Sequence, residues 1–170
     1  MLHRGMHHLA VLPSAGAWLW TTLLLATGSS LQAQAAGPEF IDPPGLTQPT
    51  GYTHAVVSAD RHTAYVVGQV AFDSTGKVVG VGDFQAQANQ VFANLGRALA
   101  SVGASFKDVV KTTTFLTDLQ NLAALRETRA RYFDVKHPPA NTLIPVMTLA
   151  RPDLLLEIEA VVDLPTGRPR

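Results

Sequence analysis

Two carboxylates spaced two residues apart, Glu157 and Glu159, are the side chains of this sequence that best suit proton-transfer chemistry. They lie in the segment LLLEIEAVVDL (154–164), whose alternating pattern predicts a β-strand with both carboxylates on one face. Residues i and i+2 of a strand are about 6.6 to 7 Å apart, a separation compatible with paired acid/base work. The competing interpretation is an ordinary solvated sheet face, because strands with one wet face are common.

A glycine interrupts another β-rich segment. Gly68, followed by Gln69, lies inside the run HTAYVVGQVA (62–71), which otherwise carries β-branched and aromatic residues. Glycine weakens a strand, so it usually marks either a bulge or a close approach by a ligand or another backbone. The sequence leaves both interpretations open.

The sequence gives little evidence for thiol chemistry, a metal site, a serine nucleophile or a phosphate-binding loop. The chain has no Cys, which excludes disulfides, thiolate nucleophiles and Cys-containing metal sites. His54, His62 and His137 lack the spacing of a metal site, and we expect them to be packing or surface residues. No G-x-S-x-G elbow or glycine-rich phosphate loop is present. We therefore expect no metal and no cofactor.

The charge balance speaks against polyanionic partners. The 13 Lys+Arg equal the 13 Asp+Glu, and the basic residues are scattered along the chain. Such a distribution provides no electrostatic footprint for nucleic acid or an anionic membrane surface. We expect neither as a partner.

The strands that must position these residues follow from β-rich runs and turn signals. Six are predicted, at 53–59, 62–71, 77–81, 108–117, 142–149 and 154–164. Pro145 lacks a backbone N–H, so it indicates an edge strand or a bulge. Residues 36–51 are rich in Pro and Gly and are predicted to form a leader arm without helix or strand.

Two helices are predicted from apolar stripes and end signals. The first follows Asp83 as N-cap and stops at Gly103. The second follows Asn121 and extends through Phe133 until the segment 137–139 ends it. The order β-β-β-α-β-α-β-β predicts an α+β domain, a mixed sheet with both helices on one face. Two helices leave the other face uncovered, so we expect a further copy of the chain to cover it.

The first 35 residues have the composition of a targeting segment. They contain no Asp or Glu, one Arg (Arg4), an apolar run at 15–26 and the small-x-small sequence Ala33-Gln34-Ala35. We expect a signal peptide (1–35) cleaved after Ala35, with export to the periplasm or outside the cell and no membrane attachment afterwards. An uncleaved anchor is the alternative, but the apolar run is shorter than the roughly 20 residues that span a bilayer.

Several blocks together resemble the RidA/YjgF family of reactive intermediate/imine deaminases. They are Tyr52, Gly68 with Gln69, the DVVKTT block (108–113), Pro139 with Ala140, and the EIEA block (157–160). The resemblance covers 52–164, which indicates a RidA-like domain at 52–165 and a short tail at 166–170.

This resemblance implies a chorismate-mutase-like α+β fold that assembles as a homotrimer, with small-molecule clefts between subunits. It implies hydrolysis of reactive 2-imino acids or their enamine tautomers to 2-keto acids and ammonia, without a cofactor. Glu157 matches the acid that activates water, and Tyr52 and Gly68 match cleft residues.

The sequence departs from the family pattern at the substrate-binding arginine, whose position holds Asn141. An amide cannot replace a charged, bidentate guanidinium. Arg126, where the family has Asn, is either a substitute cation in the cleft or a solvated helix residue. The sequence thus predicts imine or enamine hydrolysis that is weak or of altered range. The alternatives are a non-catalytic small-molecule-binding trimer in the periplasm and, with no sequence feature of its own, a chaperone-like protein.

Overall fold

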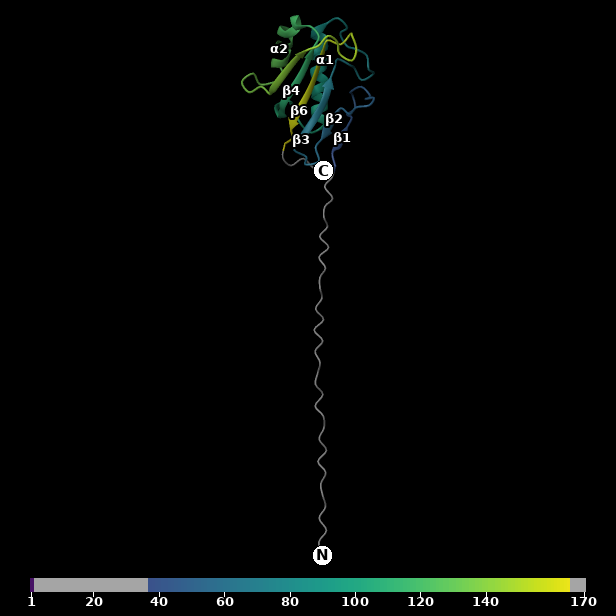
Figure 1. Ribbon diagram of the computed structural model, residues 1–170, viewed down its shortest axis with the longest axis vertical. Coiled ribbons are helices and arrows are strands. Elements are labelled where there is room, and N and C mark those ends of the chain that lie inside the picture. The colour runs from purple at the N-terminus through teal and green to yellow at the C-terminus, as the bar shows by residue number, and fades with distance from the viewer. Residues whose placement is uncertain (2–36, 166–170) are drawn as a thin grey trace. The chain divides into compact units, whose positions relative to one another are not determined.

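The computed structural model describes Met1 and residues 37–165, which form one mixed six-stranded sheet and two helices (Figure 1). The predicted signal peptide, apart from Met1, and the whole predicted tail (166–170) lie outside the described residues. The strands, in the sheet order β1-β2-β3-β6-β4-β5, are β1 Glu39–Ile41, β2 Ala55–Val57, β3 Thr63–Gln69, β6 Leu156–Asp163, β4 Val109–Leu116 and β5 Ala140–Pro145. All neighbours are antiparallel except β4 and β5, which are parallel.

Helix α1 (Phe84–Ser101) forms where its local signals agree. The Asp83 carboxylate accepts a hydrogen bond from the backbone N–H of Ala86 at 3.0 Å, which satisfies a donor of the first turn. Gly103 follows the helix at φ +70°, a conformation that a residue with a Cβ adopts at a cost. The apolar stripe is buried, with Val91, Phe92 and Leu95 at 0% exposure.

Helix α2 (Leu122–Ala130) begins after Asn121 as predicted but is shorter than predicted, and its start is capped differently. The Asn121 side chain makes no capping bond; instead, Asp118 caps the preceding turn by accepting from the N–H of Gln120. Phe133 lies beyond the end of the helix but is buried in the same core. The apolar stripe therefore extends past the end of the helix, into a turn whose Phe133 packs in the same core.

The three strands before α1 are not the three that were predicted. Residues 77–81 form only an isolated bridge between Val78 and Phe72, so the predicted strand there is wrong. The leader arm supplies β1 instead, which pairs with β2, and Glu39 of β1 forms an ion pair with Arg61 in the next turn. The prediction that 36–51 contains no strand is also wrong, because pairing to an existing edge outweighs a poor local pattern.

The two helices cover one face of the sheet (Figure 1). Helix α1 packs on β3 and β6, and α2 packs beside α1, where Gln85 donates to the Thr128 hydroxyl at 2.8 Å. Along β6, Leu156, Ile158, Ala160 and Val162 face the helices and are buried. The other face, called the open face here, carries Tyr65, Lys111, Phe115, Glu157, Glu159 and Val161. No helix of the described chain covers it, which confirms the predicted α+β layout.

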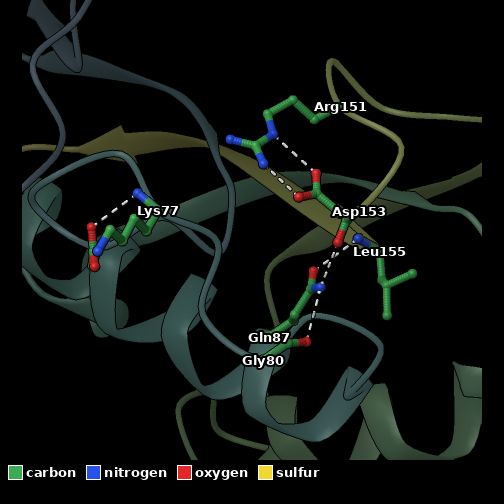
Figure 2. A network of polar contacts seen from close by, with 7 residues as sticks. Lys77, Gly80, Gln87, Arg151, Asp153 and Leu155 are labelled. Carbon is green, nitrogen blue, oxygen red and sulfur yellow. Dashed lines mark hydrogen bonds and ion pairs between the residues drawn. The ribbon is translucent and has the colours of Figure 1, made fainter.

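A buried amide fixes the start of β6. Gln87 of α1 is 0% exposed and donates to the carbonyls of Gly80 at 3.2 Å and Asp153 at 2.7 Å (Figure 2). Its Oε1 accepts from the N–H of Leu155 at 2.9 Å. Because Leu155 lies two residues before Glu157, this network ties the helix to the strand that carries the candidate acid. Unpaired, such a buried amide would be costly.

Candidate functional site

The two carboxylates of β6 lie on the open face but in different surroundings. Glu157 is half-buried beside Phe115 of β4, whereas Glu159 pairs with Thr113 and is exposed. Burial raises the pKa of Glu157, and the nearby charge of Glu159 raises it further. A carboxyl whose pKa moves toward neutrality is better suited to accept and return a proton. Of the two carboxylates, Glu157 therefore has the surroundings better suited to proton transfer, and its catalytic role stays a prediction.

Gly68 lies directly beneath the Glu157 side chain. The register of β3 against β6 shifts between Val66 and Gln69, so the glycine is part of a bulge. A Cβ on Gly68 would lie 2.6 Å from Glu157 Cδ and 2.8 Å from Cγ, and closer still to Oε1. The bulge is confirmed, whereas the group in close approach is neither a ligand nor another backbone but the side chain of the candidate acid.

Tyr52 lines a cavity beside the same glycine. It lines a cavity of about 20 Å³ together with Gly68, His54 and Gln69, enough for about one water molecule. Its ring meets the His54 ring edge to face, with centroids 5.4 Å apart. Burial raises the pKa of Tyr52, and the charge of Asp42 adds to the rise. The phenol therefore stays protonated and can donate a hydrogen bond.

The leader arm holds this corner together. His54 is 3% exposed; its Nε2 lies 2.8 Å from the carbonyl of Thr47, and its backbone N–H donates to Asp42 at 2.8 Å. Its Nδ1 lies 3.4 Å from the amide of Gln69. The sequence analysis expected packing or surface histidines, and His54 is a packing residue that supports Tyr52. Nothing local in the sequence signalled its contact with the arm.

Asn141 and Arg126 form a second group. Asn141 Oδ1 accepts hydrogen bonds from the hydroxyls of Thr112 at 2.8 Å and Thr114 at 3.0 Å. With Arg126 and Arg129 it lines a cavity of about 220 Å³ between β5 and α2. Pro145 ends β5, which is an edge strand, as the proline predicted.

The two groups lie on opposite faces of the sheet. Thr112 and Thr114, which hold Asn141, pair with Ala160 and Ile158 on the helix-covered face. Glu157 alternates with these residues and faces the other way. The structure places Gly68 against Glu157, lets Gly68 share a cavity with Tyr52, and separately brings together Asn141 and Arg126. One chain alone does not unite all five predicted site residues.

Neither group resembles a metal centre. Among the described residues, no cluster of three or more His, Asp or Glu side chains is arranged to hold a metal ion. In the same part of the chain, no helix has the length and apolar character needed to cross a bilayer.

A family model and related proteins place this chain in one family. A model of the family described as Endoribonuclease L-PSP matches residues 46–164. A RutC family protein of Synechocystis sp. is 37% identical over 119 residues, which cover 69% of this chain and 90% of that protein. The match to the family model begins at residue 46, so part of the predicted leader arm belongs to the family's domain.

Solved structures share the fold. YyfA from Yersinia pestis, a protein of unknown function from the conserved Rid family, superposes with a TM-score of 0.69 at 27% identity, covering 75% of this chain and 100% of that one. TdcF from E. coli, solved with bound serine, gives a TM-score of 0.65 at 26% identity over 74% of this chain and 98% of its own.

Proposed function

The chain belongs to the Endoribonuclease L-PSP family, the RidA/YjgF family that its motifs resemble, and on that premise we propose that it hydrolyses reactive imine or enamine intermediates to a carbonyl compound and ammonia. The observation that carries the proposal is the half-buried Glu157 carboxyl, whose pKa burial raises, lying over a residue without a side chain. The reaction is cofactor-independent, and its range differs from that of family members with an arginine at position 141.

Glu157 acts on water in this scheme. Its carboxylate accepts a proton as the water oxygen bonds to the carbon of the protonated C=N group. The protonated carboxyl then returns the proton to the nitrogen. The C–N bond breaks to release ammonia as the carbonyl forms, and the hydroxyl proton passes to the Glu157 carboxylate and from there to solvent. One residue serves as base and then as acid, a cycle that suits a carboxyl with a raised pKa. Tyr52 donates a hydrogen bond to the bound substrate.

We place this reaction between copies of the chain in a homotrimer. The open face needs a cover, and within one chain the Glu157 group and the Asn141 group lie on opposite faces of the sheet, so in this proposal one copy supplies each group to the ligand. Light scattering coupled to size exclusion should give three times the monomer mass. A monomer at micromolar concentration would contradict the proposed site.

The ligand is a small nitrogen-bearing compound. The serine bound to TdcF is an amino acid of the size and polarity of an imino acid, which supports this class. The description of the family also names a ribonuclease, but a net charge of +0 provides no basis for RNA binding, and we do not propose it.

The test is ammonia release from a panel of imines generated in situ by an amino-acid oxidase. Glu157→Gln should lower the rate by about 100-fold or more, the usual contribution of general acid/base catalysis. Glu159→Gln is the matched control, because it removes the same charge two residues away, and it should change the rate by less than about threefold. Equal small effects of the two substitutions would favour the competing interpretation, in which both carboxylates belong to an ordinary solvated sheet face. If no imine is turned over, a non-catalytic binding trimer becomes the better description.

A further inference from the structure

The cavity between β5 and α2 is cationic. Arg126, Arg129 and Asn141 line it together with Thr114 and three leucines, and no Asp or Glu is among its lining residues. Its volume of about 220 Å³ suits a small organic ligand. Two guanidinium groups without an acidic neighbour in the lining favour an anionic guest.

The two arginines are not equally available. Arg129 is half-buried, its guanidinium stacks over the Phe133 ring at 4.8 Å, and it donates to the carbonyl of Pro139 at 3.5 Å. Arg126 is exposed and has no hydrogen bond, ion pair or ring contact within the described part of the chain. Its five N–H donors are therefore free for a ligand.

Asn141 complements this cation without replacing it. Two threonine hydroxyls occupy its amide oxygen, which leaves the amide N–H groups to point at an acceptor. A carboxylate only accepts hydrogen bonds, so it fits these donors and the Arg126 guanidinium at once. A neutral amide can orient such a group but contributes no charge.

We propose that Arg126 is the residue that binds the ligand's carboxylate in this protein, in place of a guanidinium at position 141, and that the cavity selects carboxylates carrying an aliphatic chain. The apolar side of the cavity is formed by Leu122, Leu125 and Leu143, which provide a surface for such a chain. The inference rests on the proposed function only in taking this cavity as part of the ligand site.

Calorimetry on the trimer tests it with unreactive probes. The probes are 2-oxohexanoate, which carries a carboxylate and a four-carbon chain, and 2-oxohexanamide, which lacks the charge. Arg126→Ala should weaken binding of the acid by about tenfold, the lower end expected for a charge-assisted bond at an exposed site, and leave the amide unchanged. Alanine suits this exposed helix position, so the variant should fold.

Arg131→Ala is the matched control. It removes the same charge five residues further along, but Arg131 donates to Asn89 and Thr128 and does not line the cavity. It should change binding of either probe by less than about twofold. An equal loss in both variants would show that only net charge matters and would overturn the proposal.

Binding and turnover test the inference and the proposed function separately. Arg126-dependent binding of 2-oxohexanoate without hydrolysis of any imine would uphold this inference and refute the proposed function. Glu157-dependent hydrolysis, together with unchanged binding of 2-oxohexanoate by Arg126→Ala, would uphold the proposed function and refute this inference. Wild type that fails to prefer the acid over the amide would overturn the inference, as would preference for 2-oxopropanoate over 2-oxohexanoate.

Discussion

Replacing Gly68 by alanine tests whether the placement of the Glu157 carboxyl controls the reaction. The backbone at this glycine does not have a positive φ, so alanine fits the chain itself. The added Cβ would lie 2.6 Å from Glu157 Cδ and 2.8 Å from Cγ. Non-bonded carbon atoms are most stable about 3.5 to 4.0 Å apart, so the carboxyl has to move by roughly 1 Å.

A displacement of that size is expensive for catalysis. A misplacement of about 1 Å can lower a rate by about 100-fold. We therefore expect Gly68→Ala to reduce imine hydrolysis about as much as Glu157→Gln, with the loss in kcat. The two substitutions act on one carboxyl, so the double variant should be hardly slower than either single variant.

Stability gives an independent measure of the same clash. Crowding a packed site costs about 1 to 3 kcal/mol, and the melting temperature of Gly68→Ala should fall accordingly. In a Glu157→Ala background the space is vacant, so adding Gly68→Ala should cost almost nothing. Gly37→Ala is the matched control, because a Cβ there meets no atom within 4 Å. Full activity of Gly68→Ala, or equal destabilisation in both backgrounds, would refute the reasoning.

Three further predictions concern the acid, the cleft and the chain start. Burial raises the pKa of Glu157, so the contribution of its protonated carboxyl to stability is present at low pH and is lost as the pH rises through the folded-state pKa. The melting temperature of Glu157→Gln should therefore exceed that of wild type at neutral pH. The difference should vanish near about pH 4. Asn141→Arg adds a second guanidinium to that of Arg126 and should raise hydrolysis of 2-iminobutanoate by at least about tenfold, measured as imine loss with semicarbazide as competitor. An unchanged rate would show that position 141 is not decisive. Mass spectrometry of protein from the cell envelope should give a chain beginning at Ala36, whereas a full-length chain in the membrane would contradict the proposed export.

Capping residues and apolar periodicity predicted those elements whose ends and core-facing side are determined by residues within them. The first helix was predicted well because the Asp83 cap, the apolar stripe and Gly103 all act within the helix or close to its ends. Strand β1 was missed because its residues have no strand pattern of their own and are held by β2 and by the pair between Glu39 and Arg61. Edge pairing is a non-local interaction that periodicity does not record.

The site was predicted residue by residue but not as an arrangement. Strand alternation indicated the pair Glu157 and Glu159, the glycine rule indicated Gly68, and the family resemblance chose Glu157 from the pair. The contact between Glu157 and Gly68 depends on the register of β3 against β6 and on a bulge. His54 was predicted only as a packing or surface residue, because its partners Asp42 and Thr47 lie in an arm without any secondary-structure pattern. The separation of Asn141 from Glu157 required the full strand order, which places them on opposite faces.

That separation has a consequence for how ligand range can change. In the proposed function, Glu157 and Gly68 control proton transfer from the open face, whereas Arg126 with Asn141 would hold the anion from the helix-covered face. Because no hydrogen bond links the two groups within the described chain, substitutions in one should leave the other intact. Changes at Asn141 or Arg126 should then appear mainly in KM and in the choice of substrate, and changes at Gly68 or Glu157 mainly in kcat. In such a cleft, an anion-binding residue on the helix, Arg126, can take the place of one on the strand at position 141. The position of Glu157, the acid proposed to act on water, need not change.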